Sequence, residues 1–440
     1  MTEAATVQRQ FFDMLVESQY WPADRLVDHQ RAQLEQLLRH ARAHTLFYAH
    51  RLDVLFRRDG SIDWDRWRDV PILKRTELVA HHGAFLADAL PAGHGPTGEA
   101  STSGSTGFPL KVIYTRLTAL MTWAARWRAD TWHDLDWSKT LYVRHGYDEA
   151  AAWPHGLALG PWGPPWEAAA QRGRAFKLNR YAKPDQQLEF IRRIGASYAA
   201  AAAPKQAHAI ALEAERHRIE LKLGAILTSG EDVTPLDREV CRRVLGSDIV
   251  DIYSSKEGNH MAYRCPSQTC WHVNAESLLL EILDEDGNPC ESGKTGRVVI
   301  TPFFSTAQPL IRYDHGDLAV AGERCVCGRT LPTITHLLGR VVHLFRHPDG
   351  RALSAFLSEE SRVHLKAGPW QIAQVGPNDY EVRYVPLDRA VMGDEAAAEA
   401  AFRRRYFDDA TVRFRRVDSI EPLASGKFME YVNEFSPSPP

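Results

Sequence analysis

The chain is poor in cysteine, carries little net charge and lacks long apolar runs. Six cysteines among 440 residues are too few for a disulfide framework. No apolar stretch approaches the roughly 20 residues that a membrane-spanning helix needs, and the N-terminus has neither the basic nor the apolar region of a signal peptide. A formal charge of −3 argues against nucleic acid and against a polybasic membrane contact. We therefore expect a cytoplasmic protein without a membrane or nucleic-acid partner.

The composition is typical of a globular protein, and the chain is longer than one ordinary hydrophobic core needs. Hydrophobic residues make up 44% and charged residues 25% of its 440 residues, which predicts two or more domains. From residue 186 onward strands alternate with helices; Thr234 and Pro235 begin a helix between strands at 225–228 and 249–253. This alternation is typical of a parallel sheet covered by helices, with ligands bound beyond the carboxyl ends of its strands.

Other parts of the large domain show different patterns. Helical periodicity marks residues 6–45. Strands at 278–283 and 296–301, around the turn at Asp286-Gly287, predict a β-hairpin. The segment 153–166 is so rich in proline and glycine that we expect no regular structure there.

Near residue 342 the pattern of expected helices and strands changes. Alternating strands at 380–384 and 411–414, with a helix over 394–406 between them, predict a small α+β unit. We therefore divide the chain into domains of residues 1–342 and 343–440.

The most informative run lies between Ser101 and Lys111, where five hydroxyl residues are threaded through two glycines. Glycine lets the backbone turn with positive φ and bring N–H groups close to an oxyanion, and the hydroxyls add further donors without fixed charge. The pattern suits a polyphosphate. It is not the P-loop of kinases and GTPases, because Phe108 and not lysine follows Gly107. Taken alone, the run could equally be a Ser/Gly-rich surface loop.

This run resembles the phosphate loop of the adenylate-forming enzymes, the acyl- and aryl-CoA ligase superfamily. Residues 102–109 follow that loop closely, with Lys111 one position later than usual. Within the superfamily the chain is most similar to the phenylacetate–CoA ligase group, on the segments 37–48, 70–75 and 325–332. Five further matches follow in the family's order: Ser229-Gly230-Glu231, 251–257, 313–317, Gly339-Arg340 and Ser425-Gly426-Lys427.

The resemblance implies an α/β fold. Its large N-terminal adenylation domain would hold parallel sheets covered by helices and a β-hairpin or barrel-like part, and its small C-terminal α+β domain would be mobile. The implied reaction uses ATP and Mg²⁺ to convert a carboxylic acid to an acyl-adenylate, and usually transfers the acyl group to coenzyme A.

The resemblance also implies a role for each matching residue. Thr102, Ser103, Gly104, Ser105, Thr106 and Gly107, with Lys111, would bind the phosphates, and Ser229, Gly230 and Glu231 would pack on adenine. Asp251, Ile252, Tyr253, Ser254 and Ser255 would complete the nucleotide site before Glu257, the expected Mg²⁺ ligand. Asp317 would accept the ribose hydroxyls, Arg340 would support the ribose or phosphate, and Lys427 would reach the α-phosphate and the substrate carboxylate. Taken singly, Lys427 reads as a surface lysine, Asp317 as a turn residue, and Glu257 as half of a solvated ion pair with Lys256.

The chain departs from the family pattern at several places, among them His315, which replaces a threonine. Ser254 and Lys256 replace a glycine and a threonine, and Gly339-Arg340 continues as Val341-Val342-His343, without the pair of aspartates of the family pattern. In relatives this hinge allows the second half-reaction, so the acceptor stays open. An amine, a carrier-protein thiol or another small nucleophile could replace coenzyme A, and the chain could also be a non-catalytic nucleotide-binding homologue. A homodimer or a carrier-protein partner is compatible with these alternatives.

Four cysteines have the spacing of metal ligands. Cys265 and Cys270 form C-x4-C, and Cys325 and Cys327 form C-x-C, so four thiolates could close a tetrahedral zinc site. His272 is a fifth candidate, which the family resemblance favours over Cys270. We expect a structural zinc site from four of these five residues; the alternative is a set of reduced, unligated cysteines.

The acid substrate is the least determined part of the reaction. Tryptophans 123, 127, 153, 162 and 166, with Tyr147, favour an aryl or flat apolar acid, although such clusters are more often plain core. Arg126, Arg144 and His145 are candidates for binding a polar ring substituent.

Overall fold

The computed structural model describes residues 2–101, 110–144, 148–179, 182–201, 204–230, 233–340, 344–348, 352–354, 359–387, 390–405, 407–420 and 431–435. The chain forms two compact units. The first comprises residues 1–100, 111–315 and 320–336, and the second comprises residues 101–110, 316–319 and 337–440. The predicted domain boundary at 342/343 lies outside the described residues and stays a prediction.

Helices α1, α4 and α7 of the first unit each begin at a threonine whose side chain accepts a hydrogen bond from a free N–H group. Thr2 accepts a hydrogen bond from Ala5 N at the start of α1, and Thr234 and Asp237 cap α7 reciprocally. None of the described helices is long and apolar enough to cross a bilayer. The α-helices are α1 (Glu3–Ser18), α2 (Ala23–His44), α3 (Arg75–Ala80), α4 (Arg116–Trp132), α5 (Pro184–Ile194), α6 (Pro204–Arg216) and α7 (Pro235–Leu245). Short 3₁₀ turns are η1 (Asp53–Leu55), η2 (Trp64–Asp69), η3 (His82–Phe85), η4 (Glu149–Ala151) and η5 (Ala169–Gln171).

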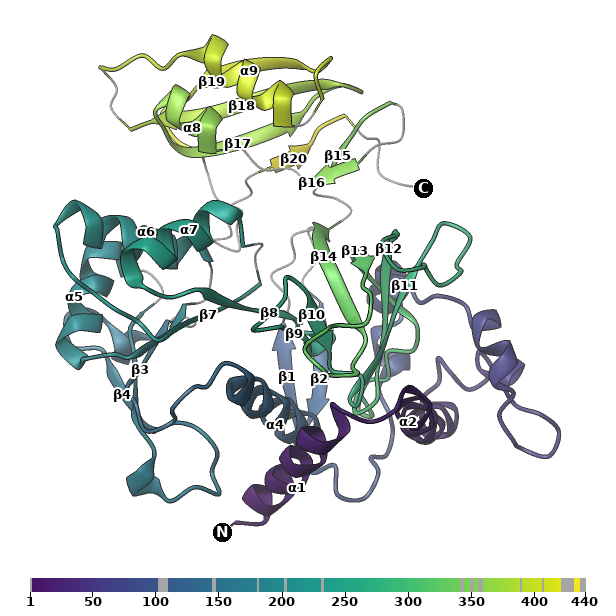
Figure 1. The fold of residues 1–440 in the computed structure, drawn as a ribbon. Helices are drawn as coiled ribbons and strands as arrows, with labels where there is room; N and C mark the ends of the chain where they lie inside the picture. Colours follow the sequence, from purple (N-terminus) through teal and green to yellow (C-terminus); the bar gives the residue numbers. More distant parts are fainter. Residues whose placement is uncertain are drawn as a thin grey trace. The chain divides into compact units, whose positions relative to one another are not determined.

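Within the described residues, twelve strands form one sheet in the order β11-β12-β13-β14-β10-β9-β8-β7-β6-β3-β5-β4 (Figure 1). Strands β5, β3, β6, β7 and β8 form a parallel block within this sheet, and β4 and β9, on either side of the block, pair antiparallel with β5 and β8. A separate pair is formed by β1 (Thr97–Ser101) and β2 (Lys111–Thr115). The strands of the large sheet are β3 (Leu141–Arg144), β4 (Leu157–Pro161), β5 (Arg174–Lys177), β6 (Tyr198–Ala201), β7 (Ala225–Ser229), β8 (Ile249–Ser255), β9 (Asn259–Arg264), β10 (Trp271–Val273), β11 (Leu278–Leu283), β12 (Thr295–Pro302), β13 (Tyr313–Ala321) and β14 (Thr333–Arg340).

The parallel part of this sheet is buried on both faces. Helices α5, α6 and α7 lie side by side over one face, where Ile226 joins a core of their apolar side chains (Figure 1). On the other face Tyr198 and Leu227 pack with Leu135 and Trp162. Continuous apolar strands require such double cover, which confirms the expected parallel arrangement.

The predicted hairpin is also confirmed. Strands β11 and β12 pair antiparallel, with Leu280 opposite Ile300. Gly287 in the connecting turn has φ +82°, a left-handed conformation that a residue with a Cβ adopts only at a cost.

One expectation is wrong: the segment 153–166 contains a regular strand. β4 (Leu157–Pro161) pairs antiparallel with β5, with a register irregularity between Ala158 and Gly160. The strand lies at the edge of the sheet, where a proline such as Pro161 removes no ladder hydrogen bond that a neighbour needs. Proline and glycine therefore shorten and bend this strand without abolishing it.

The second unit has the expected α+β character. Its four-stranded sheet has the order β19-β18-β17-β20, and Ile372 and Val382 pack against Phe402 and Phe407 in its core. The elements are β15 (Leu344–Arg346), β16 (Ala352–Ser354), α8 (Glu359–Leu365), β17 (Ala367–Gln374), β18 (Asp379–Pro386), α9 (Glu395–Arg405), β19 (Thr411–Arg416) and β20 (Tyr431–Asn433).

A buried ion pair connects helices α1 and α4 with the 274–276 segment. Arg128 of α4 and Glu276 are both fully buried, with Nη1 and Oε1 2.6 Å apart. Arg128 also donates to Asn274 Oδ1 at 2.6 Å and to the carbonyl of Leu15 in α1, and Ser18 donates to Glu276. One guanidinium therefore joins three separate segments.

We expect Arg128→Met to lower the free energy of unfolding by about 3–5 kcal/mol, because it leaves the Glu276 carboxylate buried without its cation. Urea denaturation followed by circular dichroism measures the change. The control is Arg66→Gln, which removes an exposed ion pair with Asp69 and should cost less than about 1 kcal/mol. Equal effects of the two substitutions would contradict the assignment.

Candidate active site and metal centre

Two of the predicted nucleotide-binding segments lie on neighbouring parallel strands. In the register of β7 and β8, Thr228 lies opposite Asp251 and Ser229 opposite Ile252. Because the two strands are parallel, their carboxyl ends lie on the same side of the sheet. Ser229 and Gly230 therefore lie beside the segment that leads to Glu257. Gly230 has φ +83°. Glu231 lies outside the described residues.

A tight turn after β8 carries Glu257. Ser255 Oγ accepts a hydrogen bond from Gly258 N at 2.8 Å, and Asn259, opposite Ser255 in the ladder, has φ +56°. A Cβ on Gly258 would lie 2.5 Å from Met261 Sδ, so a larger residue there would force the buried Met261 side chain to move. The turn places the Glu257 side chain in the interior, where it is 3% exposed.

The partner of Glu257 is a residue to which the sequence analysis gave no role. Arg75, the first residue of α3, donates from Nη1 to Glu257 Oε1 over 3.2 Å. Lys256 is exposed. The alternative of a solvated pair between Glu257 and Lys256 is therefore wrong. No spacing rule connects Arg75 with Glu257, which are 182 residues apart; only the fold does.

The third predicted segment lies on β13 and contacts the second. Tyr253 Oη and His315 Nδ1 are 3.3 Å apart, and the two rings meet edge to face. His315 replaces the threonine of the family pattern, and this contact gives it a structural role. On the same strand Gly316 has φ +82° and Asp317 is buried.

Several predicted site residues are placed only in part. Lys111 begins β2 and pairs with Glu99 across the β1-β2 ladder, with Nζ and Oε1 2.9 Å apart. Arg340 is the last residue of β14. Thr102, Ser103, Gly104, Ser105, Thr106, Gly107 and Lys427 lie outside the described residues, as do His145 and Tyr147.

The tryptophans expected to wall an acid pocket pack in three separate places. Trp127 contacts Trp123 and Trp166, and Phe12 of α1 covers Trp166. Trp153 packs on the core beneath α5, and Trp162 packs on Tyr198 on the opposite face of the sheet. The plain core alternative fits Trp127, which is buried, but not Trp123, whose exposed fraction is 54%; the acid pocket stays a prediction.

Arg126, a candidate for binding a polar ring substituent, forms an ion pair within its own helix. Its Nε lies 2.6 Å from Asp130 Oδ1 within α4. Burial raises the pKa of Asp130, and the nearby Arg126 opposes that shift.

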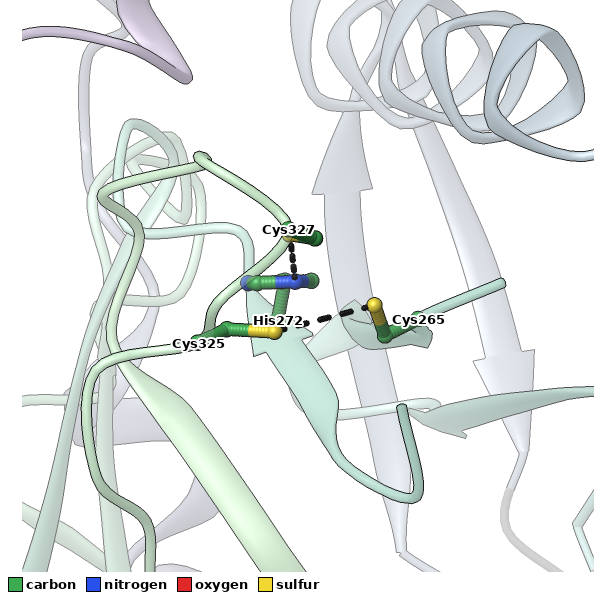
Figure 2. A group of neighbouring side chains, drawn as sticks. All are labelled: Cys265, His272, Cys325 and Cys327. Atoms are coloured by element: carbon green, nitrogen blue, oxygen red, sulfur yellow. Dashed lines mark hydrogen bonds between the residues drawn. The ribbon is translucent and has the colours of Figure 1, made fainter. Parts of the chain in front are cut away.

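The metal-ligand candidates converge on one point. Cys265 follows β9, His272 lies on β10, and Cys325 and Cys327 lie between β13 and β14; their ligand atoms are all within 4.8 Å of one another (Figure 2). Cys265 Sγ is 3.8 Å from Cys325 Sγ, and Cys327 Sγ is 3.2 Å from His272 Nε2. Three thiols and one imidazole are a donor set that fits tetrahedral zinc.

The arrangement distinguishes between His272 and Cys270 as the fourth candidate ligand. Cys270 Sγ lies 3.7 Å from Cys325 Sγ, but the four mutually close ligand atoms among the described residues include that of His272 and not that of Cys270. Burial lowers the pKa of His272 to about 4, so its imidazole is neutral at physiological pH, as a metal ligand must be. The sequence left this choice open because both residues have permissible spacing.

Comparisons with known proteins agree with the fold. No family model matches the chain. A phenylacetate-coenzyme A ligase of Thermus thermophilus is 27% identical over 341 residues, which covers 72% of this chain and 71% of that protein. A crystal structure of 2-hydroxyisobutyryl-CoA ligase in the postadenylation state matches with a TM-score of 0.70 at 18% identity, over 94% of this chain and 90% of that one.

A further likeness is weaker. The amide bond synthetase McbA from Marinactinospora thermotolerans matches with a TM-score of 0.51 at 18% identity, over 75% of this chain and 66% of that one. Together these findings confirm the fold class and the resemblance that the motifs indicated. The chain has the fold of the adenylate-forming ligases and is related in sequence to the phenylacetate–CoA ligase group.

Proposed function

We propose that this protein is an AMP-forming acid–CoA ligase, which activates a carboxylic acid with ATP and transfers the acyl group to coenzyme A. The observation that carries the proposal is the buried Glu257 on its tight turn, at the edge of the sheet where Ser229, Tyr253 and the 313–315 segment come together. The proposal is supported by the proximity of three motif segments that are far apart in the sequence, because parallel sheets bind ligands at the carboxyl ends of their strands.

In the first half-reaction, an oxygen of the acid's carboxylate attacks the α-phosphorus of ATP and pyrophosphate leaves. The loop 102–107, with Lys111, would hold the phosphates, and Asp317 would accept the ribose hydroxyls. Glu257 would hold Mg²⁺, which supplies positive charge to the phosphate oxygens when bound. Arg340 would support the ribose or phosphate, and Lys427 would bring an ammonium to the charge that develops at the reacting centre.

The acceptor and the acid are inferred less directly. Coenzyme A is supported by the names of the relatives, two of which are coenzyme A ligases. An amine is the second candidate, because the chain also resembles an amide bond synthetase and has Val342 and His343 in place of the hinge aspartates. A carrier-protein thiol is a further possibility of the same chemistry. An aryl acid is supported by the likeness to the phenylacetate-coenzyme A ligase.

The adenylation step is tested by ATP–pyrophosphate exchange with a panel of aryl and short aliphatic acids. We expect exchange with at least one acid, and a loss of about 100-fold or more in Glu257→Gln and in Lys427→Ala, because each removes charge stabilisation from the transition state. Lys139→Ala, an exposed lysine outside the site, should retain full exchange. No exchange with any acid would overturn the proposal. Adding coenzyme A or amines to the active acid then identifies the acceptor.

We also propose that Cys265, His272, Cys325 and Cys327 bind a structural zinc ion. Four protein ligands leave no open position for a substrate, so the ion would serve to join β9, β10 and the connection between β13 and β14. Such a site stabilises the folded state, because the unfolded chain does not hold its ligands together.

Metal analysis of the purified protein tests this site. We expect zinc in the wild type, in Cys270→Ser and in the control Cys290→Ser, and loss of zinc together with a lower Tm in Cys325→Ser and His272→Ala. Cys270→Ser is the decisive variant, since it separates the two ligand sets that the sequence allows. Loss of zinc in Cys270→Ser with retention in His272→Ala would contradict the assignment, as would a metal-free wild type of full stability.

A further inference from the structure

One charged residue at the candidate site has no part in the reaction described above. Arg75 lies 3.2 Å from Glu257, and both side chains are shielded from solvent, with exposed fractions of 21% and 3%. A carboxylate buried to this extent needs a positive partner. Lys256 is exposed, so Arg75 is the cation that the described contacts place on Glu257.

The backbone that carries Arg75 is held firmly against β13. Leu73 N donates to Arg312 O and Asp314 N donates to Leu73 O, each at 2.9 Å, and a parallel bridge joins Leu73 to Tyr313. Lys74 adds an ion pair with Asp314, with Nζ and Oδ2 2.8 Å apart. Arg75 therefore reaches Glu257 from a fixed position and not from a loose loop.

The start of α3 is fixed as well. Glu77 accepts a hydrogen bond from Lys74 N at 2.9 Å, and its other oxygen pairs with Arg51 at 3.0 Å. Arg51, in the turn before η1, is a guanidinium with the same exposed fraction as Arg75, 21%, but its carboxylate partner is Glu77 of α3 and not Glu257. The chain thus offers a matched control for the charge of Arg75.

We propose that Arg75 is a positioning residue, the resident countercation of Glu257. Its guanidinium orients the buried carboxylate through Oε1 and, as a positive charge next to the expected ligand, lowers the affinity of the site for free divalent metal. The inference rests on the proposed role of Glu257 as a metal ligand. Two cations that share one carboxylate repel each other, so the metal binds against the charge of Arg75.

Manganese binding to the full-length protein tests this proposal, with free Mn²⁺ measured by electron paramagnetic resonance in the absence of nucleotide. We expect Arg75→Gln and Arg75→Met to bind Mn²⁺ about three- to tenfold more tightly than the wild type, because each removes the repelling charge. Arg75→Lys keeps the charge and should resemble the wild type. Arg51→Gln should also leave Mn²⁺ affinity unchanged.

Unchanged or weaker Mn²⁺ binding in folded Arg75→Gln and Arg75→Met would overturn the proposal, and so would an equal gain in Arg51→Gln. Thermal denaturation establishes that each variant is folded, and a variant that is not folded is replaced by the other neutral one. The double variant Arg75→Gln/Glu257→Gln should lose the gain. If Glu257→Gln alone leaves Mn²⁺ binding unchanged, the metal role of Glu257 fails. Absence of pyrophosphate exchange with every acid would instead reject the ligase activity, whatever the result with Mn²⁺.

Discussion

The burial of the parallel sheet on both faces is the constraint on which the rest of the structure depends. Strands β6, β7 and β8 carry apolar side chains above and below, so polar groups can gather only where the strands end. The register of β7 and β8 brings Ser229 beside the segment that leads to Glu257 at that edge. Hydrophobic burial along the strands therefore determines where the candidate site lies.

Charged groups that are buried in this fold join segments distant in the sequence. Arg128 ties α1, α4 and the 274–276 segment together, and Arg75 ties α3 to the turn after β8. A buried ion contributes little net stability by itself, but loss of one partner leaves the other uncompensated. These pairs therefore act as specific connections, since few alternative packings would satisfy both charges.

The local patterns were good predictors of the elements. Apolar runs and caps predicted β7, α7 and β8, and the turn at Asp286-Gly287 predicted the β11-β12 hairpin. The prediction failed at β4, because proline and glycine disfavour strands in general but are tolerated in an edge strand such as β4. The tryptophans between 123 and 166 were suggestive as a group, yet they pack in different clusters. Composition alone does not say which side chains meet.

The sequence by itself determined which residue types are available and in what order: the hydroxyl- and glycine-rich run, the acidic residues after the strands, and the cysteine spacing. Those are local properties, because motifs and periodicity extend over a few residues. Only the tertiary structure decided that His272 and not Cys270 joins the cluster of four, and that Arg75 meets Glu257. Such choices depend on strand order and register, which long-range packing sets and no short window of sequence contains.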